Sequence, residues 1–337
     1  MVKSETPSIQ TLLQNFFLQR LMQQRKVSAE TTHSYRDTFR IYLQYMQDVN
    51  HKSPSEVEIV HFDLSYLRGF CEYLEKVRCN KPVTINNRIA AIKSFMHYVS
   101  ELEPEYSAIT KRALMLPAQK YEQPTMDFLT KTEFDSLITV CDTNTFIGAR
   151  DKLMLMILYN SGIRVSELLA IKLIDIQKTD SINHANLKIY GKGRKQREIP
   201  LWKNTVKYIK KYIKDYPASE DGYLFINKNG DRLTRSGVRT RINTLVTKAA
   251  DYSPSLLEKD ITPHTFRHSV AMNLLVSGVD ISTIAIWLGH SSIETTHKYM
   301  VADIESKRKA MEKAGAAGND SYRYKPSADL LSFLNSL

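Results

Sequence analysis

The segment PHTFRH at residues 263–268 places an imidazole and a guanidinium one helical turn apart. Thr262 is a favourable N-cap and Pro263 a favourable first helical residue, so His264 and Arg267 should share one helix face. An arginine can contact two non-bridging oxygens of a phosphate, and an imidazole can supply a third hydrogen bond. The pair therefore indicates a phosphate site, although either residue alone is plausibly a structural histidine or a surface arginine. A metal site is disfavoured because no carboxylate or second ligand set accompanies the pair.

A second arginine, Arg164, lies in the segment SGIRVSEL. We expect Gly162 to end a buried helix, Ser166 to cap the next helix and Glu167 to follow that cap. Taken alone, Arg164 is best explained as the partner of Glu167 in an ion pair at a helix start. It becomes a candidate phosphate ligand only together with the histidine and arginine described above.

Two further candidates follow a predicted turn in the segment WLGHSSIETTHKYM. His290 comes directly after Gly289, and Tyr299 stands among polar residues instead of on an apolar stripe. A tyrosine hydroxyl in such surroundings can serve as a nucleophile. Most of the 18 tyrosines must be structural, so base rates alone do not select Tyr299.

The composition limits the class of protein that carries these residues. The 337-residue chain has 47 Lys and Arg against 36 Asp and Glu, a formal charge of +11 that favours a polyanionic partner. A hydrophobic content of 42 % excludes a disordered, collagenous or coiled-coil chain, and the length predicts two domains. Three cysteines without a CxxC pair exclude a disulfide framework and a zinc site. No apolar stretch is long enough to span a bilayer, so we expect a cytoplasmic, nucleoid-associated protein without membrane contact.

The first third of the chain has a helical pattern throughout. Ser28, Asp63 and Thr84 are the expected caps of the second, third and fourth helices of a bundle. The segment 116–127, LPAQKYEQPTMD, contains two prolines and no periodicity, which predicts an exposed linker.

The second part mixes helices with a hairpin. Thr130 and Glu133 form a capping box, and the helix over about 147–160 is apolar nearly all round, which predicts the centre of a core. The segment 187–201, LKIYGKGRKQREIPL, has the pattern of a β-hairpin with a basic, Gly-rich turn, and 223–226 is a candidate strand beside it. Later helix boundaries are expected at Thr234, Thr262, Gly278 and Gly289. The fold class is therefore mainly α with a small β-hairpin or sheet, divided into 1–115, the linker 116–127, a second domain over 128–316, and a tail over 317–337.

Basic residues mark three candidate DNA-contact regions. They lie on the second and fourth helices, in the hairpin turn, and on the helix after Thr234, which could enter a major groove and read bases. For each residue a solvated polar face, or contact with backbone phosphates alone, is as good an explanation. The residues are Arg36, Arg40, Arg88, Lys93, Arg194, Lys195, Arg235, Arg239 and Arg241.

The combined set resembles the tyrosine recombinase family, the phage-integrase and Xer-type site-specific recombinases. Order, spacing and flanking residues agree from Thr130 to Tyr299, and the N-terminal bundle resembles the core-binding, SAM-like domain of the family more loosely. The resemblance implies a two-domain clamp around DNA. The residues that carry it are Arg164, Lys192 in a basic hairpin, His264, Arg267, His290 and Tyr299.

The resemblance also implies a mechanism. Tyr299 would attack a DNA phosphodiester to give a 3′-phosphotyrosyl intermediate and a free 5′-hydroxyl. Arg164 and Arg267 would neutralise the charge on the phosphate oxygens, while His264 and His290 hydrogen-bond the same group. No metal or nucleotide cofactor is needed for this chemistry.

Other positions would support that reaction. Lys192 matches the family's general acid for the leaving 5′-oxygen, and Lys195 and Arg194 in the same turn remain alternatives. Glu167 would orient Arg164, and His268 fits a packing role.

The tail suggests how copies of the chain assemble. Its apolar residues recur at helical spacing, and the resemblance implies that this helix packs on a neighbouring protomer in a cyclic tetramer. Docking on its own domain is the alternative. The expected partners are a specific duplex site with inverted half-sites, a second copy on that site and four copies in the synapse, with accessory proteins left open. The apolar residues are Leu330, Phe333, Leu334 and Leu337.

Two other functions remain in competition. A catalytically silent DNA-binding protein of the same fold is disfavoured by the intact candidate set. A type IB topoisomerase would use a similar tyrosine, and the separable helical domain and the tail favour recombination over it. The sequence does not distinguish phage integration, transposition, inversion and chromosome-dimer resolution.

Overall fold

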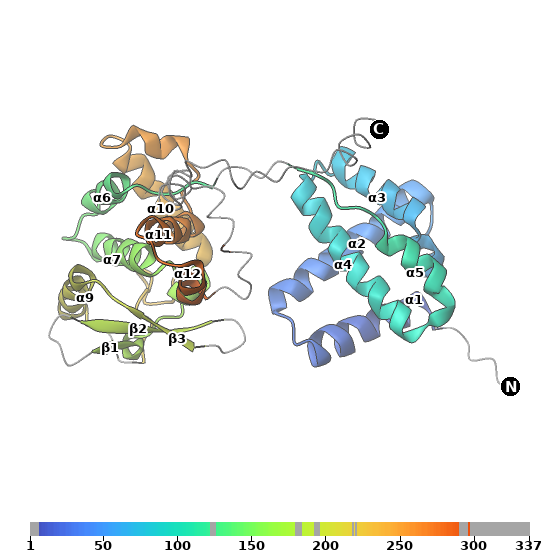
Figure 1. Cartoon of the computed structure of the whole chain (residues 1–337), viewed down its shortest axis with the longest axis horizontal. Helices are drawn as coiled ribbons and strands as arrows, with labels where there is room; N and C mark the ends of the chain where they lie inside the picture. The colour runs from blue at the N-terminus through green and yellow to red at the C-terminus, as the bar shows by residue number, and fades with distance from the viewer. Residues whose placement is uncertain are drawn as a thin grey trace, which may run out of the picture. The chain divides into compact units, whose positions relative to one another are not determined.

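The computed structural model describes residues 7–121, 126–178, 184–191, 196–217, 219, 221–289 and 296. The chain divides into two compact units, Met1–Gln123 and Pro124–Leu337, and each has its own apolar core (Figure 1). The predicted class, mainly helical with a small sheet, is confirmed. Within the described ranges, no helix combines the length and the apolar character that crossing a membrane requires.

The N-terminal unit is a bundle of helices. Ser28 accepts from the backbone of Thr31 at the start of α2, and Asp63 accepts from the backbone of Leu64 at the start of α3, as predicted. Thr84 is not a cap, because Pro82 takes the first helical position of α4 and moves its start forward. The elements are α1 (Ile9–Asn15), the π-helix η1 (Phe16–Gln24), α2 (Ala29–Asn50), η2 (Pro54–Glu56), η3 (Ile59–Phe62), α3 (Leu64–Lys76), α4 (Pro82–Leu102), η4 (Pro104–Tyr106) and α5 (Ser107–Leu114).

Aromatic side chains fill the centre of this bundle. Tyr42 packs against Phe62 and Phe70 with ring centroids 4.6 and 4.9 Å apart, and its hydroxyl donates to the backbone oxygen of His61. Phe39 and Phe95 continue the cluster at 5.4 Å. These edge-to-face and stacked pairs stabilise the bundle beyond the area that they bury.

Parts of the predicted linker pack on the unit next to them. Leu116 is buried, and its carbonyl accepts from Lys93 Nζ at 2.6 Å. Asn86 exchanges two hydrogen bonds with the backbone of Gln119, at 2.8 and 2.9 Å. The stretch is nevertheless mostly exposed, as predicted, since Pro117, Ala118, Lys120 and Tyr121 face solvent. Only Leu116 is buried, and side chains of α4 satisfy backbone groups that no helix pairs.

The second unit combines helices with an antiparallel sheet. The capping box of Thr130 and Glu133 begins α6, and Thr234 and Thr262 cap α10 and α11, all as predicted. The elements are α6 (Lys131–Thr139), α7 (Phe146–Ser161), α8 (Val165–Leu168), η5 (Leu173–Asp175), β1 (Ile176–Lys178), β2 (Ala185–Tyr190), β3 (Gln196–Pro200), α9 (Lys203–Asp215), α10 (Arg235–Ala249), η7 (Pro254–Glu258), α11 (Pro263–Val276) and α12 (Ile281–Leu288).

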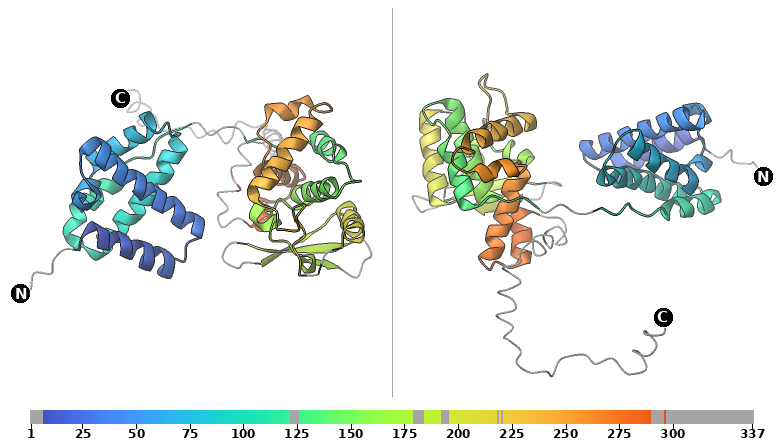
Figure 2. Two further views of the ribbon diagram at one scale, coloured as in Figure 1. Left: turned by 180° about the vertical axis from the view of Figure 1, so that it is seen from behind. Right: turned by 90° about the horizontal axis from the view of Figure 1, so that it is seen from above.

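Helix α7 lies in the middle of this unit, with α11 and α9 packed against it (Figures 1 and 2). The predicted hairpin is present as β2 and β3, paired antiparallel with Leu187 opposite Ile199. Strand β1, which was not predicted, adds to the free edge of β2. The segment 223–226 does not join this sheet, because Tyr223 and Ile226 form isolated bridges with Lys172 and Arg232.

Candidate active site

Arg164 stands at the junction of α7 and α8. Gly162 ends α7 with φ +62°, where a Cβ would lie 2.7 Å from a methyl carbon of Leu288. Arg164, and not the expected Ser166, is the N-cap of α8, and its backbone N–H donates to Glu167 Oε2 at 2.9 Å. The tight turn at Gly162 therefore fixes where the Arg164 side chain leaves the backbone.

Arg267 lies in the second turn of α11 and is only 3 % exposed. Its Nη1 donates to the Gly162 carbonyl at 2.8 Å and its Nη2 to the Leu288 carbonyl at 2.7 Å. A guanidinium held by carbonyls of two different elements has little freedom to move. The side chain therefore fixes the end of α7 against the end of α12.

His264 lies on the same helix face as Arg267, three residues before it. Its pKa is lowered by partial burial and by the positive charges of Arg267 and Arg164, which places the three side chains in one neighbourhood. Burial lowers the pKa of His268 further, to about 4. Both imidazoles are therefore predominantly neutral at neutral pH, and a neutral ring can donate from one nitrogen while it accepts at the other.

Arg197 on β3 also belongs to this cluster, although we did not predict it. Its Nη1 and Nη2 donate to the two oxygens of Glu167 at 3.1 and 2.8 Å, and its Nε donates to the Trp287 carbonyl at 3.0 Å. Burial alone would raise the pKa of Glu167, but the hydrogen bonds and charges of Arg197 and Arg164 leave it lowered. Glu167 is thus an ionised carboxylate shared by two arginines, which extends its predicted role as the partner of Arg164 (2.9 Å).

The C-terminal end of α12 collects all three arginines. Three consecutive carbonyls, those of Trp287, Leu288 and Gly289, accept from Arg197, Arg267 and Arg164 in turn. Cations are favoured at this negative end of the helix dipole. Gly289 has φ +67°, and a Cβ there would lie 2.8 Å from Arg197 Nη1, so a larger residue would strain the backbone and displace that guanidinium.

Several predicted site residues lie outside the described residues, and their roles remain predictions. This group comprises Lys192, Arg194, Lys195, His290 and Tyr299. The structure describes Gly191 and Gln196, which flank the hairpin turn. It also describes Gly289, which directly precedes His290.

The basic residues of α10 differ in their surroundings. Arg235 and Arg239 lie on the exposed surface, and Arg239 makes a 3.3 Å ion pair with Asp260. Arg241 pairs at 2.6 Å with the fully buried Asp151, which also binds Arg150. This ion pair gives Arg241 a structural role, because releasing it would leave a buried carboxylate short of a partner, and its contact with DNA stays a prediction.

The basic residues of the N-terminal unit also differ from one another in exposure and in hydrogen-bond partners. Arg36 and Arg40 are exposed on α2, and Arg36 pairs with its neighbour Asp37 at 3.0 Å. Arg88 donates to Asn80 at 3.2 Å, while the ammonium group of Lys93 binds the Leu116 carbonyl described above. Of these four residues, Arg36 and Arg40 are exposed, and Arg88 and Lys93 are partly buried.

The described residues contain no cluster of three or more His, Cys, Asp or Glu side chains arranged to hold a metal ion. What converges instead is a set of guanidinium donors and an imidazole. That arrangement suits an oxyanion such as a phosphodiester.

Comparison with known proteins identifies the family. Residues 127–305 match the phage integrase family, and residues 15–101 match the phage integrase N-terminal SAM-like domain. The chain therefore belongs to the phage integrase family of tyrosine recombinases. It is an enzyme that breaks and rejoins DNA in site-specific recombination.

Individual relatives agree with that assignment. A putative integrase/recombinase, y4rC, of Sinorhizobium fredii is 38 % identical over 98 % of each chain. The tyrosine recombinase XerD of Oceanobacillus iheyensis is 32 % identical over 82 % of this chain and 89 % of the relative.

Solved structures agree in fold. The XerH site-specific recombinase bound to a palindromic difH substrate has a TM-score of 0.67 at 22 % identity, with 87 % of this chain and 81 % of that chain covered. A Tn1549 transposon integrase in complex with a circular intermediate DNA has a TM-score of 0.67 at 20 % identity, with 90 % and 99 % covered.

Proposed function

We propose that this recombinase cleaves each DNA strand with Tyr299 and that Arg164, Arg267 and His264 bind the scissile phosphate. The observation that carries the proposal is the convergence of two arginines and a histidine from α8 and α11 on one neighbourhood. Arg164 is 35 % exposed, and its contacts with Glu167 and Gly289 use two of the five N–H donors of a guanidinium. Donors therefore remain on Arg164 for a phosphate that approaches from solvent.

The chemical step follows from these assignments. The Tyr299 oxygen bonds to phosphorus as its proton passes to solvent, and the bond from phosphorus to the 5′-oxygen breaks. That oxygen takes a proton from Lys192, with Lys195 as the alternative donor, and His290 adds a hydrogen bond to the phosphate. Attack by the 5′-hydroxyl of a second duplex reverses the step and exchanges strands. The energy of the phosphodiester is kept in the phosphotyrosine, so no cofactor is required.

The test is a covalent adduct on a nicked duplex that carries the inverted repeats beside the gene. With EDTA present, wild type is expected to yield an adduct on a denaturing gel, and peptide mass mapping should place the nucleotide on Tyr299. An adduct at another residue would show that the nucleophile is wrongly assigned. Binding without an adduct on any inverted repeat would favour the silent DNA-binding protein, and relaxation of plasmids without joining of two sites would favour the topoisomerase.

DNA contacts beyond the phosphate site are part of the same proposal. Arg36 and Arg40 are the residues of the N-terminal unit best placed to neutralise phosphates, since both are exposed. Arg235 and Arg239 are the corresponding pair on α10. Both units would then bind the duplex, and the protein would be associated with the nucleoid. The names of the two relatives, an integrase/recombinase and XerD, are compatible with integration, transposition and dimer resolution. A recombination assay distinguishes these three reactions by their products.

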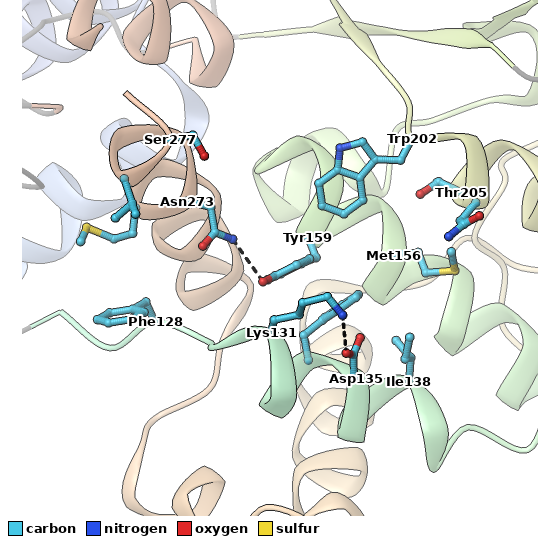
Figure 3. Close-up of a pocket in the computed structure, with 14 residues that line it drawn as sticks. Phe128, Lys131, Asp135, Ile138, Met156, Tyr159, Trp202, Thr205, Asn273 and Ser277 are labelled. Atoms are coloured by element: carbon cyan, nitrogen blue, oxygen red, sulfur yellow. Dashed lines mark hydrogen bonds and ion pairs between the residues drawn. The ribbon is translucent and has the colours of Figure 1, made fainter. Parts of the chain in front are cut away.

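For assembly, we propose that the tail of one protomer docks on its neighbour. A cavity of about 620 Å³ opens among α6, α7, α9 and α11 (Figure 3). Its lining is largely apolar, and Trp202 and Phe128 are 52 % and 41 % exposed. The tail lies outside the described residues, and its four apolar residues supply a segment of matching chemistry in the sequence. The assembly would be a dimer on each site and a tetramer in the synapse, with any accessory protein still to be identified.

Removing residues 327–337 is expected to abolish the tetramer on DNA while each protomer still binds its half-site. Trp202→Ala should have the same effect, and Tyr252→Ala, an exposed aromatic outside the cavity, should not. Sedimentation of the protein on DNA measures the assembly. Mixing the two variants distinguishes docking between protomers from docking within one chain. The Trp202→Ala protomer keeps its tail and the truncated protomer keeps its cavity, so the two can meet only if docking is between protomers. Docking between protomers predicts mixed pairs of the two variants, joined by one intact interface, and the absence of any such pair would contradict it.

A further inference from the structure

Glu167 has a hydrogen-bond shell shared between two arginines. Its side chain is 4 % exposed. Oε1 accepts from Arg164 Nη1 at 2.9 Å and Arg197 Nη1 at 3.1 Å, while Oε2 accepts from Arg197 Nη2 at 2.8 Å and the Arg164 backbone at 2.9 Å. A carboxylate offers about four acceptor sites, so these four bonds saturate it.

Without Arg197 this balance would be lost. A carboxylate as buried as Glu167 cannot draw compensating hydrogen bonds from bulk water, and each oxygen would be left with one donor. Arg164 is the nearest flexible guanidinium, and a two-pronged pair is the geometry that an arginine prefers with a carboxylate. We therefore expect the Arg164 guanidinium to form a bidentate pair with both oxygens of Glu167. Its N–H donors would then be lost to the phosphate.

We infer that Arg197 is a positioning residue: by occupying both oxygens of Glu167 with its own guanidinium, it keeps Arg164 available for the scissile phosphate. The same side chain links β3 to the end of α12 through the Trp287 carbonyl at 3.0 Å. The Arg197 guanidinium packs close to Gly289, where a Cβ would lie 2.8 Å from its Nη1. The inference rests on the proposed role of Arg164 in phosphate binding.

The contrast between single and double variants tests this role. Arg197→Met is expected to slow single-turnover cleavage of a nicked duplex by about 10–100-fold, the usual cost of losing a group that orients a catalytic side chain. Adding Glu167→Gln removes the charge that captures Arg164, so the double variant should cleave about tenfold faster than Arg197→Met alone. A substrate with a neutral methylphosphonate at the scissile position, which needs less charge neutralisation, should show a smaller loss for Arg197→Met.

A merely structural role would give a different pattern. Removing both side chains would then be at least as harmful as removing one, and both substrates would suffer equally. Lys259→Met is the matched control, because Lys259 pairs at 2.7 Å with Glu133, a carboxylate that is also 4 % exposed. It is expected to lower the melting temperature without a difference between substrates. If Arg197→Met does not fold, Arg197→Gln carries the same comparison with Glu167→Gln.

The outcomes separate this inference from the proposed function. A double variant no faster than Arg197→Met, in a protein whose wild type forms the adduct and whose Arg164→Ala variant does not, overturns the positioning role alone. If Arg164→Ala cleaves like wild type, the role of Arg164 at the phosphate is wrong, and the positioning role fails with it.

Discussion

A Tyr299→Phe variant should bind recombination-site DNA as wild type does and form no covalent adduct. The substitution removes one oxygen, the proposed nucleophile, and leaves the ring in place. Loss of a nucleophile typically lowers turnover by about 10⁴-fold or more, so the adduct should fall below detection on a denaturing gel. Native gel shifts measure binding in the same samples.

The control for this experiment is another tyrosine of the same unit. Tyr252 is 68 % exposed, and Tyr252→Phe should leave adduct formation unchanged. An adduct formed by the Tyr299→Phe protein would assign the nucleophile to a different residue. Loss of DNA binding together with the adduct would indicate a folding defect, which the melting temperature detects.

The second large effect is expected at Arg267. Arg267→Lys keeps the charge but loses the planar fork that reaches the carbonyls of Gly162 and Leu288. Removing a preorganised donor from a developing oxyanion typically costs about 10²–10³-fold in rate, and displacement of the ends of α7 and α12 adds to that loss. Stability should fall as well, by about 1–3 kcal/mol for each buried carbonyl left without a donor.

Single-turnover cleavage and thermal unfolding measure the two effects separately. Arg150 offers a matched control, because it is also 3 % exposed and donates to Asp151 and to the Ile226 carbonyl. Arg150→Lys should lower stability with little change in the cleavage rate of the folded protein. A cleavage rate for Arg267→Lys within tenfold of wild type would contradict its assignment to the phosphate.

The sequence predicted best where local chemistry decides the structure. Ser28, Asp63 and Thr130 cap helices as expected, because a short polar side chain followed by a helical pattern leaves the backbone few alternatives. His264 and Arg267 share a helix face for the same reason. Convergence of this pair with Arg164 depends on contacts between distant segments, so the order of the motifs could suggest it and the spacing alone could not.

The wrong predictions have identifiable causes. Thr84 is not a cap because Pro82, two residues earlier, already occupies the first position of the helix. Ser166 is not a cap because the helix begins after Arg164, whose backbone N–H donates to the Glu167 side chain. Tyr223 has a strand-like sequence but pairs with Lys172 outside the sheet. Sheet pairing is a tertiary property, and short apolar runs do not determine it.

Arg197 was missed because a basic residue near a Gly-rich, basic turn is expected to face solvent. A signal was nevertheless present. Arg197 and Ile199 are two residues apart on β3 and therefore point to the same face, and Ile199 is buried. A charged residue on the same strand face as a buried residue predicts a buried counter-ion, which here is Glu167.

The three arginines bind main-chain oxygens at the end of α12, which has consequences for how this sequence can diverge. Side chains along Ile281–Leu288 can be exchanged without removing any of these acceptors, since every residue type supplies a carbonyl. Length is a different matter. Inserting or deleting one residue would rotate the carbonyls by about 100° around the helix axis and turn all three away together. We therefore expect relatives to vary at the positions of this helix outside the core formed by Ile284 and Leu288 and to preserve its residue count up to the glycine.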